Sequence, residues 1–239
     1  MDRMNRMDEM DFGSFTGTFE RVDRAHGAAR GALVVLVLVA AWGGALPTGA
    51  EEPASDIPHV LVVTDRGELE LELFPQQAPI TVANFLRYVD RGIYDTGATF
   101  YRVVRPDNQP GHPVPIEVIQ GGLTIEDEHP RRLAPIEHET TEDTGLRHRD
   151  GTVSMARNAP GSASSEIFIC VGDQPELDFG GRRNPDGQGF AAFGRVVRGM
   201  DVVHAIQKLP DRDQMLVEPV KILEVRRVAS AAPRATEAP

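Results

Sequence analysis

The chain has 239 residues, of which 41% are apolar and 26% charged, and this length suits one medium-sized domain with extensions or two small domains. Its 36 acidic and 25 basic side chains give a formal net charge of −11, which argues against a nucleic-acid partner, because phosphate binding requires a basic surface. The single cysteine, Cys170, excludes an internal disulfide and a zinc site built on cysteines.

The first 50 residues differ from the rest of the chain. An apolar run of about 15 residues, 32–46, follows a polar stretch that contains Arg21, Arg24 and Arg30. The run is shorter than the roughly 20 residues of a membrane-spanning helix and fits the hydrophobic region of a signal peptide. The segment Thr48-Gly49-Ala50 has a small residue at each end, as a signal peptidase requires before its cleavage site. We therefore expect cleavage near Ala50 and a periplasmic or secreted protein; the alternative is an inner-membrane anchor formed by 32–46.

Two further segments are expected to lie outside the folded domain. Residues 51–56 form a short spacer, and residues 229–239 are rich in alanine and proline, a composition typical of a disordered tail. One domain is therefore predicted between residues 57 and 228.

Most of this domain is predicted to be short strands separated by turns. The sequence of Glu68–Phe74 is E-L-E-L-E-L-F, and its strict alternation directs three leucines to one face and three glutamates to the other. The segment 65–67 before it predicts a hairpin turn. The other predicted strands are His59–Thr64, Thr99–Val104, Ile116–Gln120, Thr152–Ala156, Glu166–Val171, Phe190–Val197 and Val220–Arg227.

Two segments have the periodicity of a helix. After Pro79, apolar residues from Val82 to Val89 recur with helical spacing. A second helix is predicted over 200–208, before Pro210. Eight strands and two helices, without βαβ alternation, predict a mainly β fold: a closed, eight-stranded antiparallel barrel capped by two α-helices.

Motifs for covalent, phosphate or metal chemistry are missing from the sequence. The segment 187–192 matches G-x-G-x-x-A, but it leads into a predicted strand, whereas a dinucleotide motif opens a helix. There is no G-x-S-x-G nucleophile elbow. We therefore expect no metal and no cofactor. Two long loops rich in glycine and proline, 105–115 and 178–189, have the length of functional loops.

Six short segments, taken in order, resemble the cyclophilin family of peptidyl-prolyl cis-trans isomerases. They are Thr99-Phe-Tyr-Arg-Val-Val104, Val118-Ile-Gln-Gly-Gly122, Gly151-Thr-Val-Ser-Met-Ala156, Ser165-Glu-Ile-Phe-Ile-Cys170, Phe193-Gly-Arg-Val-Val197 and Gly199-Met-Asp-Val202. The resemblance covers about residues 57–228 and implies the same barrel that the patterns predict. It also implies a monomeric isomerase of proline-containing polypeptides, which here would be unfolded or exported proteins.

The resemblance implies a role for individual residues. Arg102 is the expected catalytic residue, because a cation donor aimed at the prolyl nitrogen favours the twisted X-Pro bond over the planar one. Phe168, Leu177 and Val118 would line a proline pocket, and Gln120 would hold the substrate backbone. The substrate-binding residues implied in full are Phe100, Val118, Gln120, Ala156, Arg157, Asn158, Glu166, Phe168, Leu177 and Phe190.

Three acidic residues and an insertion depart from the family pattern. Glu117 stands where an aromatic pocket residue is usual, Glu166 replaces a glutamine, and Glu176 replaces an apolar residue. The segment 108–116 lengthens the connection between Arg102 and the Gln-Gly-Gly motif. We expect these changes to make the groove more acidic. Glu117 and Glu166 motivate an alternative, a proline-binding chaperone or assembly module with little catalysis. A third possibility is a structural barrel whose groove has lost its function.

Overall fold

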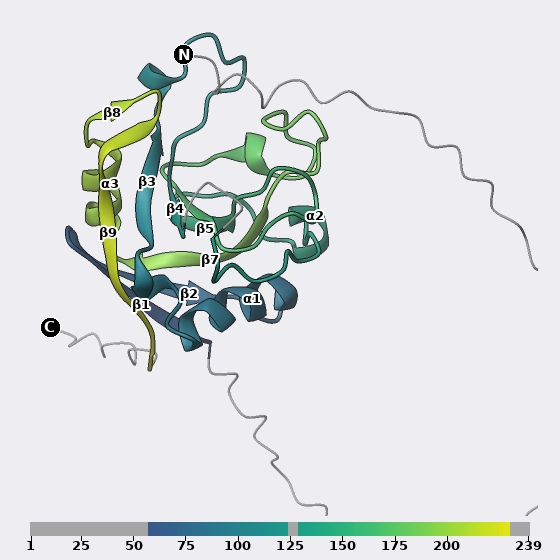
Figure 1. The fold of residues 1–239 in the computed structure, drawn as a ribbon. Coiled ribbons are helices and arrows are strands. Elements are labelled where there is room, and N and C mark those ends of the chain that lie inside the picture. The colour runs from purple at the N-terminus through teal and green to yellow at the C-terminus, as the bar shows by residue number, and fades with distance from the viewer. Residues whose placement is uncertain (1–56, 124–128, 230–239) are drawn as a thin grey trace, which may run out of the picture. The chain divides into compact units, whose positions relative to one another are not determined.

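The computed structural model describes residues 57–123 and 129–229. Its strands are β1 (His59–Thr64), β2 (Gly67–Leu73), β3 (Thr99–Val104), β4 (Val118–Gly122), β5 (Thr152–Met155), β6 (Ile167–Cys170), β7 (Ala191–Arg198), β8 (Asp211–Arg212) and β9 (Met215–Val228). All pairs are antiparallel. The order β1-β2-β7-β5-β6-β4-β3-β9 closes into an eight-stranded barrel because β9 also pairs with β1 (Figure 1). The predicted barrel is confirmed; the two-residue β8, which pairs with β9, was not expected.

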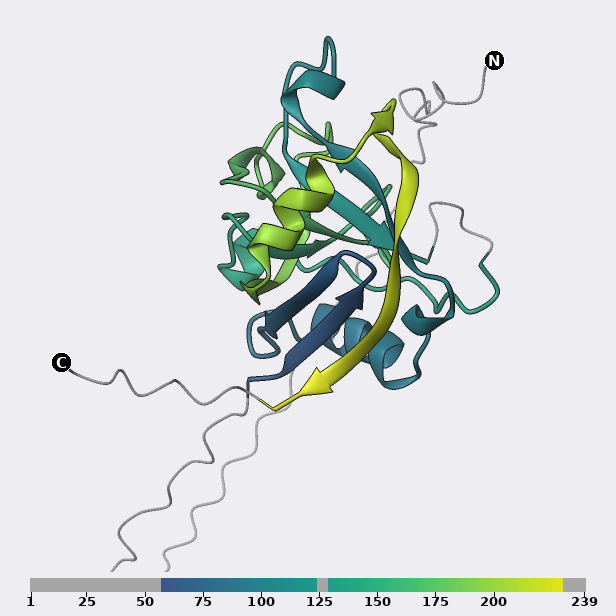
Figure 2. The same ribbon diagram turned by 90° about the vertical axis from the view of Figure 1, so that its left-hand side faces the viewer.

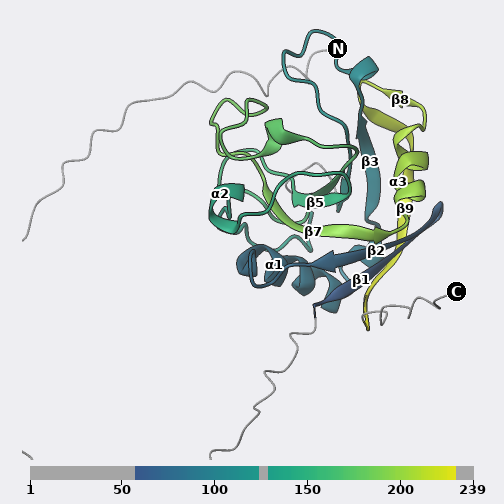
Figure 3. The same ribbon diagram turned by 180° about the vertical axis from the view of Figure 1, so that it is seen from behind.

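The two predicted helices are α1 (Pro79–Asp90) and α3 (Met200–Gln207), and a single-turn helix, α2 (Thr141–Thr144), is an addition. Helix α3 packs against β2, β3 and β4, and α1 packs against β7 and β9 (Figure 2). Figures 1 and 3 place α2 and its neighbouring loops on the side of the barrel away from α3. The region around α2 therefore lies on the other side of the strands from the second capping helix.

Strand alternation divides the apolar residues into two clusters. In β6, Ile167 and Ile169 belong to the large main core, whereas Phe168 and Cys170 belong to a smaller second cluster. Successive side chains of a strand point to opposite faces, so the main core fills the barrel and the second cluster lies on its outer face. The expected alternation in β2 is confirmed, since its three leucines are fully buried.

A β-bulge in β3 decides which face each of its side chains occupies. The pairing of β3 with β4 and with β9 shifts between Phe100 and Arg102, and bulges commonly re-aim side chains near functional sites. Phe100 is fully buried in the main core. Its ring lies so close to Gly121 that a Cβ there would come within 2.8 Å of it. The expectation that Phe100 contacts substrate is therefore corrected, because its side chain is inside the barrel.

The predicted export segment 1–50, the spacer 51–56 and the tail from residue 230 lie outside the described residues. Among the described helices, none has the length and apolar character needed to cross a membrane.

Candidate active site

One row of paired residues crosses four neighbouring strands on the outer face of the barrel. Arg102 of β3 pairs with Gln120 of β4, Gln120 pairs with Phe168 of β6, and Phe168 pairs with Ser154 of β5. Adjacent strands lie about 4.8 Å apart, so these four residues are neighbours although the chain separates them widely. The row brings three residues of the sequence prediction, Arg102, Gln120 and Phe168, into one site.

Two glutamine side chains hold the guanidinium of Arg102. Nη1 donates to Gln120 Oε1 at 2.8 Å, and Nε and Nη2 donate to Gln214 Oε1 at 3.1 and 2.5 Å. Both acceptors are uncharged, so the positive charge is oriented without being neutralised. Of the five N–H groups of an arginine, three are used, and two have no acceptor among residues 57–123 and 129–229. Burial lowers the pKa of Arg102, but an arginine stays protonated at neutral pH.

Beside Arg102 lies the second apolar cluster, which contains the predicted pocket residues. Val118, Phe168 and Leu177 are almost completely buried in it, and the partly exposed Ala156 and Phe190 pack against it. The ring of Phe190 meets that of Phe168 edge-on, with 5.3 Å between centroids. The structure therefore gathers five of the predicted substrate-binding residues next to the guanidinium.

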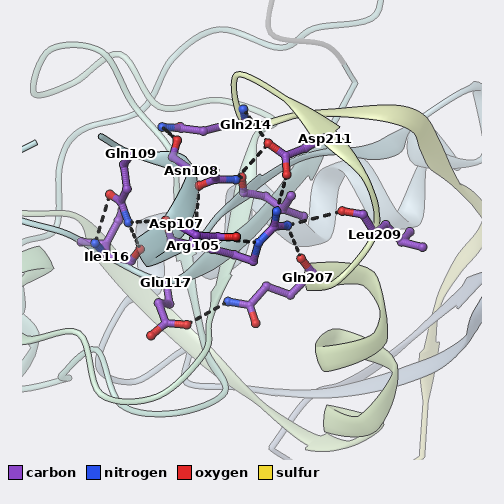
Figure 4. Close-up of polar contacts among 11 residues, drawn as sticks. Arg105, Asp107, Asn108, Gln109, Ile116, Glu117, Gln207, Leu209, Asp211 and Gln214 are labelled. Carbon is purple, nitrogen blue, oxygen red and sulfur yellow. Dashed lines mark hydrogen bonds and ion pairs between the residues drawn. The ribbon is translucent and has the colours of Figure 1, made fainter. Parts of the chain in front are cut away.

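Ile116 contributes to this cluster and was missed as a site residue. Its side chain is buried among Val118 and Phe168, whereas that of Glu117 faces helix α3 and accepts a hydrogen bond from Gln207 at 3.4 Å (Figure 4). Because neighbouring residues of an extended chain point to opposite sides, the apolar neighbour of Glu117 occupies the side where the cluster lies. Glu117 therefore does not face the cluster, which corrects our expectation that it makes the groove acidic.

Glu166 lies next to the row but is held by its neighbours. It accepts hydrogen bonds from the hydroxyls of Tyr101 at 2.7 Å and Ser165 at 2.8 Å, and it forms an ion pair with Arg132 at 3.4 Å. Burial, and then the charge of Glu166, raises the pKa of Tyr101, so the phenol remains a donor. Tyr101 also accepts from Gln120 Nε2 at 3.1 Å, which links Glu166 to the row. The negative charge of Glu166 is thus balanced by Arg132.

A second positive charge at the site emerges when the partly buried arginines are compared by their partners. Within the described ranges these arginines are Arg102, Arg105, Arg132, Arg157 and Arg183. Three of them have carboxylate partners, whereas Arg102 and Arg183 have none among the residues that the structure describes. Arg183 donates to Gln109 Oε1 at 3.1 Å and to the carbonyl of Val114 at 2.8 Å.

Arg183 also lies close enough to Arg102 for their charges to interact. Burial, followed by the charge of Arg102, lowers the pKa of Arg183 to about 10. Glu176, the third acidic departure, is engaged by Arg182 at 2.8 Å. The site is therefore locally positive, the opposite of what its acidic substitutions suggest.

Three hydrogen-bonded buried residues, His148, Asp178 and Ser154, lie next to the ring of Phe168. His148 stacks on Phe168 with ring centroids 5.8 Å apart, donates through Nδ1 to Asp178 at 2.8 Å and contacts the hydroxyl of Ser154 through Nε2 at 2.9 Å. Burial favours a higher pKa for Asp178, but hydrogen bonds from His148 outweigh it and lower the pKa. The residue types are those of a serine hydrolase, but Ser154 is fully buried and inaccessible to a substrate carbonyl. We assign this chain of residues to support of the Phe168 ring.

Arg157 joins the end of β5 to the long loop 178–189. Its guanidinium forms a two-point ion pair with Asp186 at 2.7 and 2.9 Å and donates to the carbonyl of Gly189. It also lies 5.2 Å from the ring centroid of Phe190. Asn158 is exposed, and its backbone N–H donates to the hydroxyl of Ser162. Arg157 thus orders the loop that leads into Phe190. In the described part of the chain, no hydrogen bond joins Asn158 to a residue of the row.

Comparison with known proteins agrees with this site. Residues 59–227 match the family profile described as "Cyclophilin type peptidyl-prolyl cis-trans isomerase/CLD". Peptidyl-prolyl cis-trans isomerase A of Dickeya dadantii is 39% identical over 157 residues, 65% of this chain and 74% of that protein. Peptidyl-prolyl cis-trans isomerase cyp18 of Streptomyces antibioticus is 43% identical over 145 residues, 60% of this chain and 80% of that protein.

A solved structure of a cyclophilin type peptidyl-prolyl cis-trans isomerase from Cryptosporidium parvum has the same fold. Its TM-score is 0.57 at 22% identity, and the match covers 73% of this chain and 99% of that one. The chain belongs to the cyclophilin type peptidyl-prolyl cis-trans isomerase family and is an enzyme of that class.

Within the described residues, no group of three or more His, Cys, Asp or Glu side chains lies together as metal ligands would.

Proposed function

We propose that Arg102 carries the isomerisation of X-Pro bonds in this protein, with Gln120 holding the substrate backbone and the Phe168 cluster receiving the proline ring. The observation that carries the proposal is the row across β3, β4 and β6, which sets a cation with two available N–H groups beside an apolar cluster. This is the arrangement that a rotating prolyl bond requires.

The chemistry needs no bond to the protein. Rotation about a peptide bond is opposed by a conjugation barrier of ~18–20 kcal/mol. In the twisted state conjugation is lost and the prolyl nitrogen gains a lone pair that accepts a hydrogen bond. A donor that meets this lone pair only in the twisted state stabilises the transition state without stabilising the ground state, which is the condition for a higher rate.

The side-chain carbonyl groups that bind Arg102 suit its proposed role as a donor to the prolyl nitrogen. A carboxylate partner would neutralise the guanidinium and weaken its attraction for the developing lone pair, whereas Gln120 and Gln214 only orient it. The apolar cluster excludes water from the same region, which strengthens the remaining hydrogen bond. Orientation and charge are therefore both preserved.

The positive charge shared by Arg102 and Arg183 leads to a prediction about substrates. For a peptide series with glutamate, glutamine or lysine flanking the X-Pro pair, we expect kcat/KM to fall in that order, with about a three- to tenfold span at low salt. Added NaCl should shrink the span, because salt screens charges at this distance. Isomerisation rates at two salt concentrations measure it.

The neighbouring arginine gives a matched control for this prediction. Arg183→Gln should remove most of the preference, whereas Arg182→Gln should retain it, since Arg182 is exposed and already paired with Glu176. An equal preference for glutamate in both variants would show that Arg183 is not its source, and the net charge of −11 would favour lysine instead.

The functional test is an NMR exchange measurement on a short X-Pro peptide, whose uncatalysed exchange takes tens to hundreds of seconds. We expect the full chain to accelerate exchange. Binding of the peptide without acceleration would instead support a proline-binding chaperone or assembly module. Neither binding nor acceleration would support a structural barrel. The acidic residues that motivated the proline-binding alternative, Glu117 and Glu166, engage Gln207 and Arg132 in the structure, which weakens that alternative.

We also propose that the protein acts on exported chains after cleavage near Ala50. The support is the sequence alone: the apolar run 32–46 has the length of a signal-peptide core. N-terminal sequencing of the protein from the periplasmic or secreted fraction tests this, with Glu51 expected as the first residue. An intact N-terminus in the membrane fraction would assign 32–46 to an anchor.

A further inference from the structure

The segment 105–108, which leads into the insertion 108–116, is joined to the end of α3 and to the hairpin formed by β8 and β9. Arg105 donates through Nη1 to the carbonyl of Gln207 at 2.6 Å and forms an ion pair with Asp211 (Figure 4). Asn108 donates to the other oxygen of Asp211 at 3.0 Å. Segments about a hundred residues apart in sequence are therefore held together by charged and neutral hydrogen bonds.

The turn of this hairpin is Asp213-Gln214, and both residues have positive φ, 51° and 71°. Two-residue turns of this kind favour asparagine and glycine, because other residues are strained there. The amide of Gln214 donates to Asp211 Oδ2 at 3.0 Å and its side-chain Nε2 to the carbonyl of Asn108 at 3.3 Å. A strained backbone maintained by surrounding contacts points to a functional demand on that position.

The function of this strained turn is to place the side chain of Gln214 against the guanidinium of Arg102. Gln214 Oε1 accepts from both Nε and Nη2 of Arg102, while the carbonyl of Gln214 accepts from the amide of Val103 at 2.8 Å. Gln120 holds only Nη1. Two of the three hydrogen bonds that fix the orientation of Arg102 thus come from the hairpin turn.

We propose that Gln214 is a positioning residue for Arg102, and that Arg105, just before the insertion, and Asn108, its first residue, lock the hairpin that presents Gln214 by binding Asp211. This inference rests on the proposed role of Arg102. Gln214 does not reach the substrate in this scheme. It acts by directing the two remaining N–H groups of Arg102 toward the prolyl nitrogen, where a small error in orientation lowers the rate strongly.

The test is a double-mutant cycle with Gln214→Ala and Arg102→Ala in the full chain, with kcat and KM measured separately by NMR exchange. Gln214→Ala should lower kcat about tenfold and leave KM unchanged within twofold. In the Arg102→Ala background it should have no further effect, because no guanidinium is left to position. Asp211→Asn should lower kcat by a smaller factor through the same route.

Asp213→Ala is the matched control, since it truncates the adjacent turn residue, which has the same backbone conformation but no bond to Arg102. Its kcat should match the wild type. If Arg102→Ala lowers kcat but Gln214→Ala does not, or if the two effects multiply, the inference about Gln214 is overturned and the role of Arg102 stands. If Arg102→Ala itself has no effect, the proposed function fails. Gln214→Met, which keeps the length without the acceptor, replaces Gln214→Ala if that variant does not fold.

Discussion

We expect Arg102→Ala to lower kcat/KM for X-Pro isomerisation by about ten- to a hundredfold. A hydrogen bond from a charged donor contributes roughly 1.5–3 kcal/mol, and each 1.36 kcal/mol is about a factor of ten in rate. The apolar cluster and Gln120 remain in the variant and retain peptide affinity, so KM changes little. Exchange spectroscopy on an X-Pro peptide measures both constants.

Arg102→Lys separates charge from geometry. A lysine keeps the positive charge but lacks the planar fork, so it cannot donate to Gln120 and Gln214 at once. We expect it to recover only a small part of the lost rate. Thermal unfolding of both variants serves as the control, because the partners of Arg102 are uncharged and little stability should be lost. Wild-type turnover by folded Arg102→Ala would remove Arg102 from the mechanism.

Truncation of Phe168 is the second change with a large expected effect. It should lower both the stability of the protein and its affinity for the peptide. Phe168 is 4% exposed, stacks on His148 and meets Phe190 edge-on. Loss of a buried phenylalanine side chain costs about 3–5 kcal/mol of unfolding free energy. It also removes the surface on which the proline ring is proposed to pack, so Phe168→Ala should raise KM. Urea unfolding and peptide titration measure the two effects.

Phe168→Leu and Phe193→Leu form a matched pair that distinguishes the effects. Phe193 is fully buried in the main core, inside the barrel. Both changes should lower stability by a comparable amount, but only Phe168→Leu should raise KM. A similar loss of peptide affinity in both variants would mean that binding depends on general stability and that Phe168 is not a contact of the substrate.

The elements of the fold were predictable because their signals are local. The alternation of β2 and the apolar spacing of α1 are properties of a few neighbouring residues, and the structure has both elements. Boundaries were less accurate: β4 begins at Val118, two residues after its predicted start. The two-residue β8 gave no periodic signal and was missed.

The candidate site was predictable only in part. Arg102, Gln120 and Phe168 stand in motifs that occur in family order, so the resemblance identified them without any knowledge of strand pairing. Phe100 was placed wrongly, because the bulge that separates its face from that of Arg102 is a property of the paired strands. The acidic character expected from Glu117 and Glu166 was also wrong, because the orientation of one and the ion pair of the other depend on neighbouring elements.

The sequence alone thus determined the eight strands of the barrel and helices α1 and α3, and it indicated Arg102 as the candidate catalytic residue, since these follow from local patterns and ordered motifs. The tertiary structure decided what holds that cation and what charge surrounds it. Gln214 lies 112 residues from Arg102, and Arg183 approaches from another loop. Contacts between such distant segments follow from barrel closure and strand register, which no local pattern contains.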